Sequence, residues 1–364
     1  MSSQPDTTNP TVDVDALTAR HASQIDLLHG LVAVQSLSGQ EANAVNFLVA
    51  EMKARGFDQA FVDGVGNAVG VKGSGPTRIV LLGHIDTVPG DIPVRVEEGV
   101  LHGRGSCDAK GPLATFVAAT EQATGENATI TVVGAVGEES IGSPGAYEAA
   151  TWPAPHFCII GEPSSWDAVC LGYRGTVSFT YRLTQAGRHT AGPGETVGEQ
   201  GVLFWNTLLA EIQQINGDAE GYNAVGWSLR SINTSTDGLY DTVEMSIGLR
   251  LPPSVPSGTI LDLLESIRDS GEIELHGVQE GYSTDKRNPM TPPFLRAIRA
   301  QGGNPRFTRK LGTADMTVVG PVWKCPIVAY GPGDASLDHT PEERIDLDDY
   351  LRAVRILTSV LNEL

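Results

Sequence analysis

Four short, mostly apolar runs constrain the fold of this chain more than any other feature. They lie at residues 79–82, 130–136, 157–160 and 326–330. Their length and composition are those of strands buried on both faces, and the segments between them are long enough for crossover helices such as 112–123. Apolar residues at helical spacing predict two opening helices, at 16–34 and 41–55. The pattern predicts an α/β fold, in which ligands bind beyond the carboxyl ends of the strands.

The middle of the chain has a different pattern. Residues 175–183 alternate between apolar and polar side chains, as in a half-exposed strand. The segments that follow predict a helix, two strands, a helix and a last strand, at 198–215, 223–232, 242–251, 258–269 and 272–281. This order is ferredoxin-like. We therefore expect a second domain at 173–287, inserted into a first domain made of 13–172 and 288–364, and a disordered polar segment at 1–12.

Composition and charge exclude several classes of function. The net charge of −19 disfavours binding to nucleic acid or to anionic membranes, so neither partner is expected. No run of 18 apolar residues is present, and the first residues lack the pattern of a secretory signal, which predicts a cytoplasmic protein. The four cysteines form no C-x-x-C pair, so we expect reduced thiols and no thiolate metal site.

Histidine and acidic residues follow the predicted strands. His84 and Asp86 come directly after the first strand, where an extended backbone points both to one side, so that the imidazole can bind a metal while the carboxylate holds the ring. A core histidine beside a turn aspartate is the other interpretation of this pair. Asp108 ends a glycine-rich turn ahead of a helix, where it either bridges two cations or caps the helix.

Three further loops supply the remaining groups, which are Glu138, Glu139, Glu162 and His339. Each is unremarkable alone, but the joint placement at one sheet edge is hard to obtain by accident. Two histidines and three carboxylates without thiolates suit zinc, cobalt or manganese, and a shared carboxylate implies two ions about 3.5–4 Å apart. Glu138 is then the acid left over, and we expect it to act as the general base.

The segments GHIDTVP, GRGSCDAKGP, GEES, GEP and DHTPEE resemble, in order and spacing, the dinuclear zinc amidohydrolases and metallopeptidases. That family includes aminoacylases, acetylornithine deacetylase and succinyl-diaminopimelate desuccinylase. The resemblance implies a zinc-peptidase-like catalytic domain with an inserted ferredoxin-like lid, through which the chain forms a homodimer. It implies that water activated by two zinc ions attacks an amide carbonyl.

The same resemblance implies a role for each motif residue. His84 and Glu162 would bind the first zinc, Glu139 and His339 the second, and Asp108 both. Asp86 would orient His84, Glu138 would be the base, and a lid histidine, His189, would stabilise the oxyanion, often from across the dimer.

Weaker marks resemble the subgroup of LysW-lysine/ornithine hydrolases, which cut the isopeptide bond between lysine or ornithine and the terminal glutamate of a small carrier protein in lysine and arginine biosynthesis. These marks are the segments around residues 92–96, 282–286 and 311–316. The likeness implies that Asn233, Arg250, Lys286 and Thr313 contact the substrate. Arg250 is equally interpretable as a surface cross-strand partner.

Residues 286–310 contain seven basic and no acidic residues, a local charge of +7 in a chain of net charge −19. They are either a solvated face or a surface that receives an acidic carrier, for which Arg306, Arg309 and Lys310 are the candidates. Two other functions stay open: an N-acetylornithine or N-acetyl-lysine deacetylase, and a catalytically silent metal-binding interaction protein. The sequence has no G-x-S-x-G, H-E-x-x-H or P-loop motif, which disfavours serine hydrolases, zincins and nucleotidases.

Overall fold

The structure, a computed structural model, describes residues 14–364 except 125–126, 141 and 190–191. The disorder expected for residues 1–12 therefore lies outside the described residues. The largest feature is a nine-stranded sheet in the order β1-β2-β6-β3-β7-β15-β8-β13, with β14 paired to β8. Its strands are β1 (Gln59–Val62), β2 (Ala68–Lys72), β3 (Thr77–His84), β6 (Ala128–Ala135), β7 (Phe157–Gly161), β8 (Ala168–Tyr173), β13 (Tyr282–Ser283), β14 (Arg306–Lys310) and β15 (Ile327–Ala329).

The centre of this sheet consists of the four strands that the apolar runs predict. β6, β3, β7 and β15 are adjacent and parallel. Their carboxyl ends therefore meet at one edge of the sheet, which confirms the α/β prediction. The crossover from β3 to β6 contains β4 (Arg95–Glu97), β5 (Val100–His102) and α3 (Lys110–Gln122). β4 and β5 form a small three-stranded sheet with β16 (Arg344–Asp346), which comes from near the end of the chain.

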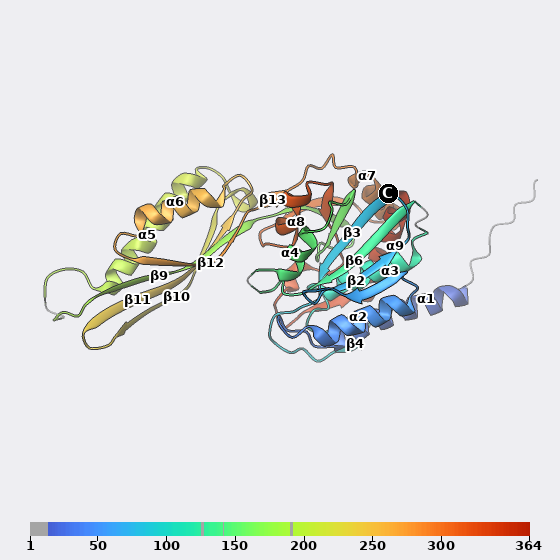
Figure 1. Cartoon of the computed structure of the whole chain (residues 1–364), viewed down its shortest axis with the longest axis horizontal. Coiled ribbons are helices and arrows are strands. Elements are labelled where there is room, and N and C mark those ends of the chain that lie inside the picture. The colour runs from blue at the N-terminus through green and yellow to red at the C-terminus, as the bar shows by residue number, and fades with distance from the viewer. Residues whose placement is uncertain (1–13, 125–126, 141, 190–191) are drawn as a thin grey trace, which may run out of the picture.

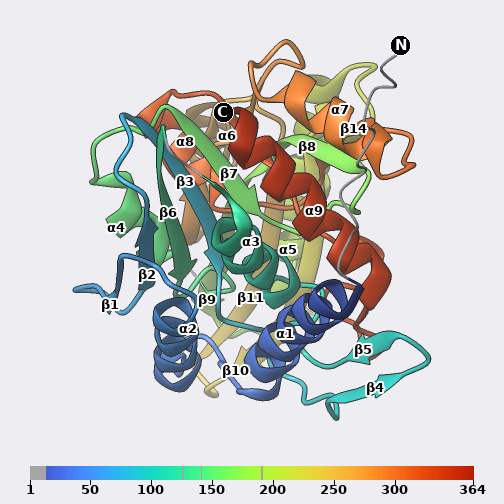
Figure 2. The same ribbon diagram turned by 90° about the vertical axis from the view of Figure 1, so that its right-hand side faces the viewer.

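Helices cover both faces of the large sheet (Figures 1 and 2). Alternate residues of β3 belong to different cores: Ile79 and Leu81 pack on one face, and Val80 and Leu82 on the other. The first face is covered by α1 (Val14–Ala33), α2 (Ala42–Ala54), α3, α7 (Thr291–Ala300) and α9 (Leu347–Glu363). The second is covered by α4 (Pro144–Ala150) and α8 (Met316–Trp323). Burial on both faces holds the strand ends at fixed positions.

A second, four-stranded antiparallel sheet stands apart from the first (Figure 1). Its order, β10-β11-β9-β12, is the ferredoxin-like one that the middle of the chain predicts. Its elements are β9 (Gly175–Ala186), α5 (Val197–Asn216), β10 (Gly226–Thr236), β11 (Tyr240–Leu251), α6 (Ser257–Ile267) and β12 (Glu272–Gln279). α5 and α6 pack on one face and form a separate core with it. We call this unit the lid; the exact boundaries at 173 and 287 stay a prediction.

The sequence patterns did not predict every element. The missed strands include the edge hairpin of β1 and β2, and β8, β13 and β14, while the missed helices include α4, α7, α8 and α9. None of the described helices is long and apolar enough to span a membrane.

Candidate metal centre

The loops at the carboxyl ends of the central strands bring the predicted ligands together. His84 is the last residue of β3, Glu139 follows β6, and Glu162 follows β7. His339 lies in the loop after β15. Asp108 does not follow a central strand. It lies between β5, a strand of the small sheet, and the start of α3. It still reaches the same edge, since α3 begins the return crossover from β3.

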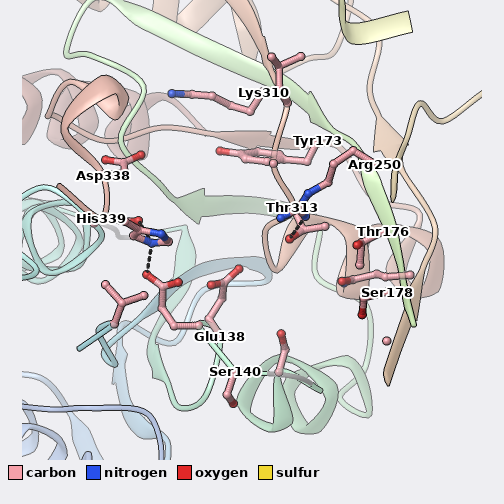
Figure 3. Close-up of a pocket in the computed structure, with 18 of the residues that line it drawn as sticks. Glu138, Ser140, Tyr173, Thr176, Ser178, Arg250, Lys310, Thr313, Asp338 and His339 are labelled. Carbon is pink, nitrogen blue, oxygen red and sulfur yellow. Dashed lines mark hydrogen bonds and ion pairs between the residues drawn. The ribbon is translucent and has the colours of Figure 1, made fainter. Parts of the chain in front are cut away.

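Three triads of donor atoms form at this edge, with the atoms of each triad within 4.8 Å of one another. Two of them share Asp108: His84, Asp108 and Glu162 form one, and Asp108, Glu139 and His339 the other. The third consists of His84, Glu138 and Glu139. His84 Nε2 lies 3.1 Å from Asp108 Oδ1 and 4.0 Å from Glu162 Oε1. His339 Nε2 lies 3.2 Å from Asp108 Oδ2 and 2.8 Å from Glu139 Oε1 (Figure 3). Asp108 thus turns one carboxylate oxygen toward each histidine, as a bridging ligand would.

Asp86 does more than hold the ring of His84. The His84 ring contact at hydrogen-bond distance is between Nδ1 and the Asp86 main-chain carbonyl, at 3.0 Å, while the carboxylate lies 3.6 Å away. The carboxylate instead accepts hydrogen bonds from the amides of Glu138 and Glu139, each 3.0 Å, and from the Ser38 hydroxyl at 2.7 Å. Asp86 is fully buried. One side chain therefore fixes the turn that presents the predicted base and a predicted ligand.

Glu343 holds the Asp108 loop in a similar way, and sequence reasoning gave it no role. Its Oε1 accepts from the amides of Cys107 and Asp108, both at 3.1 Å, and its Oε2 pairs with Arg104 at 2.7 Å. Its side chain is 1% exposed. Glu343 lies four residues after His339 and accepts from the amide of Asp108. It therefore connects the loops that carry Asp108 and His339, two predicted ligands of one triad.

Burial and charge in this edge favour cations. Burial raises the pKa of the carboxyls of Glu138 and Glu162 well above the ordinary value, with neighbouring acids adding to the effect. Hydrogen bonds to Asp108 and Glu139 raise the pKa of His339 to about 10. Burial would raise the pKa of Asp108 as well, but hydrogen bonds from His339 and His84 hold it below its usual value. The site combines imidazole and carboxylate groups, and its buried carboxylates have too little positive charge beside them. Divalent metal ions fit such a site.

The metal centre forms the floor of a cleft of about 780 Å³ between the large sheet and the lid, within the usual range of ligand pockets. Figure 3 shows Glu138 and His339 on one side, and Arg250 and Thr313 on the other. Two of the four predicted substrate contacts, Arg250 and Thr313, line the cleft, and Arg250 donates to the Thr313 hydroxyl at 3.2 Å. Arg250 is thus a cleft residue and not merely a surface cross-strand partner.

Three predicted site residues lie elsewhere in this single chain. Asn233 and Lys286 are exposed and are not among the residues that line the cleft. His189 is exposed, three residues after the end of β9. β9 runs away from the large sheet, so its last residues lie at the far end of the lid (Figure 1). A chain on its own therefore does not bring these side chains to the metal centre.

Of the basic residues at 286–310, Lys310 lines the cleft. Others have local partners: Arg296 pairs with Glu363, Arg306 lies 3.0 Å from Asp167, and Arg309 lies over the Tyr222 ring. The cleft also contains residues that sequence reasoning missed, namely Arg230, Tyr173, Ser140, Ser178 and His276. Ser140 ends the GEES segment but was given no role, and no motif marks the other four.

Comparison with known proteins places this geometry in context. Residues 80–363 match the model of peptidase family M20/M25/M40. The chain is 44% identical over 351 residues to the [LysW]-lysine hydrolase of Deinococcus radiodurans, covering 93% of this chain and 96% of that protein. It is 28% identical to the [LysW]-lysine/[LysW]-ornithine hydrolase of Sulfurisphaera tokodaii, covering 93% and 95%. A tripeptidase from Staphylococcus aureus has the same fold, with a TM-score of 0.77 at 16% identity over 94% of this chain and 98% of that one.

Proposed function

The chain belongs to peptidase family M20/M25/M40, and from this we propose that it is a hydrolase that releases lysine, ornithine or both from the terminal glutamate of the carrier protein LysW. The observation that carries the proposal is the convergence of two ligand triads, sharing Asp108, beneath a cleft that also contains Glu138 and Arg250. Relatives that match nearly the whole chain are named for this activity. The reaction suits a biosynthetic enzyme of the cytoplasm, where we place it.

We assign the two ions to the two triads. His84 and Glu162 would hold one ion, Glu139 and His339 the other, and Asp108 would bridge them. Zinc is the metal that best suits this donor set, with cobalt as an alternative. When bound, the ions supply the positive charge that lowers the pKa of water and polarises an amide carbonyl.

Glu138 is the proton carrier in this proposal. It faces the cleft between the ligands and Arg250, and its backbone is fixed by the buried Asp86 (Figure 3). A carboxylate with a raised pKa takes a proton from the attacking water and gives it to the departing amine more readily than an ordinary one. Asp86 contributes by holding the main chain of Glu138 with its carboxylate and the His84 ring with its main-chain carbonyl.

We propose that the enzyme is a homodimer. β10 is an edge strand of the lid sheet, and its region exposes large apolar side chains, among them Trp227, Ile232, Leu239 and Tyr240. Exposed apolar groups along an open strand edge favour association with another chain. A second copy docked there would bring its His189 and Asn233 toward the cleft of the first chain. In that cleft the His189 side chain would stabilise the oxyanion.

In the proposed substrate, the amino acid to be released lies in the cleft, and the carrier protein to which it is joined lies outside. We assign Arg250 and Thr313 to the carboxylate of the bound amino acid, because a guanidinium and a hydroxyl together suit that group. Lys310 stands in the cleft, and the basic residues near it on β14, Arg306 and Arg309, would receive an acidic carrier. Lys286, exposed beyond the cleft, would contact the carrier rather than the amino acid.

The decisive assay measures bound metal and the release of amino acid from carrier-lysine, carrier-ornithine, acetyl-lysine and acetylornithine. We expect two ions per chain and a preference for the carrier conjugates. A preference for the acetyl compounds would instead identify a deacetylase, and no release from any of them would indicate a silent metal-binding protein. The variant Glu138→Gln should keep its metal while turnover falls by orders of magnitude, and near-normal turnover would remove Glu138 from the role of base.

A further inference from the structure

Arg230 occupies an irregular position in the lid sheet. β10 pairs with β11 in a register that shifts between Leu229, opposite Ile247, and Ser231, opposite Ser246. Arg230 is therefore the extra residue of a β-bulge and has no partner in the register. Bulges re-aim side chains and occur often beside active sites. Here the bulged residue, Arg230, lines the cleft.

The neighbouring strand leaves room for the Arg230 guanidinium. A Cβ added to Gly248 would lie 3.1 Å from Arg230 Nη2 and 3.3 Å from Nε, so the guanidinium rests where a side chain of β11 would stand. Arg250 follows two positions later on β11 and points to the same face, because alternate residues of a strand share a face. Thr176 and Ser178 on β9 face the same cleft and are small. Two guanidinium groups thus lie side by side on a surface of short side chains.

This pair is short of negative charge. Within the described residues, neither Arg230 nor Arg250 lies within 4.0 Å of an acidic side chain, whereas Arg182 on the same sheet pairs with Glu244 at 2.7 Å. Burial and, to a smaller extent, the charge of Arg230 lower the pKa of Arg250, and Glu138 opposes this in part. Like charges held together in a cleft favour a ligand with two anionic groups.

We propose that Arg230 is a specificity-determining residue, which binds a second carboxylate of the substrate on the carrier side of the scissile amide. The inference rests on the proposed function: a terminal glutamate joined through its side chain keeps a free α-carboxylate, and the released amino acid has a carboxylate of its own. Arg250 is partly buried beside Thr313 and takes the inner carboxylate. Arg230 lines the same cleft but is exposed, so we assign it to the side from which a carrier protein approaches.

The test uses two synthetic peptides that end in glutamate linked through its γ-carboxyl to lysine. One has the free α-carboxylate at the glutamate and the other an α-carboxamide. For the wild type, we expect kcat/KM to be about 10- to 100-fold higher for the carboxylate, as is typical of a charge-assisted pair. Arg230→Ala should reduce this ratio to near one by slowing only the carboxylate peptide. Gly248→Ala, which displaces the guanidinium without removing it, should reduce the ratio partially.

Arg182→Ala is the matched control, because it removes a lid guanidinium that is already paired and does not line the cleft. It should keep the wild-type ratio. Binding of both peptides to metal-loaded Glu138→Gln, with and without Arg230→Ala, gives the same ratio without turnover. A ratio unchanged by Arg230→Ala in both assays overturns the inference and leaves the proposed function standing. Absence of lysine release from the wild type contradicts the proposed function, while the binding ratio still decides the role of Arg230.

Discussion

Replacing Glu343 tests whether one buried carboxylate sets the shape of the metal centre. Glu343→Gln keeps the volume of the side chain but removes its charge and turns one acceptor oxygen into a donor. The native carboxylate accepts two amide hydrogen bonds of 3.1 Å, from Cys107 and Asp108, and pairs with Arg104 at 2.7 Å. The new amide nitrogen must therefore face either a backbone N–H or a guanidinium, and one buried donor loses its partner.

The expected cost follows from these contacts. Hydrogen bonds to charged groups contribute about 1.5–3 kcal/mol each, and breaking one side of a buried ion pair costs about 3–5 kcal/mol. The glutamine still accepts one bond, so we expect the free energy of unfolding to fall by about 2–4 kcal/mol. Because the same loops carry Asp108 and His339, metal affinity should fall by about 10- to 100-fold, as for other groups that orient ligands.

Denaturant unfolding of metal-free protein gives the first quantity, and competition with a chelator gives the second. Glu342→Gln is the matched control, since it makes the same change at the exposed neighbouring residue and should alter neither. The pair Arg104→Met and Glu343→Gln, made singly and together, should show a coupling energy of about 1–3 kcal/mol. If Glu343→Gln stays within about 0.5 kcal/mol of the wild type and retains its metal affinity, the carboxylate does not organise the centre.

Three further predictions concern the sheet edge. Asp86→Asn leaves one of the two amides of the Glu138–Glu139 turn without an acceptor. We expect kcat to fall at least about tenfold, and elemental analysis to show the loss of one ion per chain. Full activity with two ions bound would contradict this. Burial raises the pKa of Asp315 to about 7. The contribution of Asp315 to stability should therefore decline as the pH rises from 4 to 7. Relative to the wild type, metal-free Asp315→Asn should be about 2–4 kcal/mol more stable at pH 8 but not below pH 4; a difference that does not change with pH would refute this. In Gly161→Ala the new Cβ would lie 2.8 Å from the Phe116 ring, so thermal unfolding should show a loss of about 1–3 kcal/mol, and an unchanged midpoint would mean that the ring moves freely.

The sequence predicts the fold, and it predicts that most of the proposed ligands lie at one sheet edge, because both follow from the positions of the buried strands. Apolar runs such as residues 79–82 mark buried parallel strands, and the ends of parallel strands meet, so His84 and His339 are expected together although 255 positions separate them. The ferredoxin-like fold of the lid was predicted from strands with alternating apolar and polar residues and from the order in which strands and helices follow one another. Elements with weaker patterns were missed, as in β14, whose basic sequence is that of an exposed surface rather than of a strand.

Contacts that depend on long-range packing were not predictable. Asp86 accepts from Glu139, and Glu343 from Cys107, but nothing in either local sequence indicates which distant amide a buried carboxylate will meet. Arg230 reaches the cleft through a bulge, and one extra residue in a strand leaves no signature in the alternation of exposed positions. Contacts that a second copy of the chain would make are equally unpredictable from the pattern of a single sequence.

The insertion of the lid within the catalytic sheet has a consequence for synthesis on the ribosome. His84, Asp108 and Glu162 are all translated before the lid, so the proposed binding set for one ion is complete early, whereas the other proposed set waits for His339. β15, which lies between β7 and β8, also arrives late. Until β15 is made, β7 is an open strand edge, so the nascent half-sheet is more prone to association than the finished one.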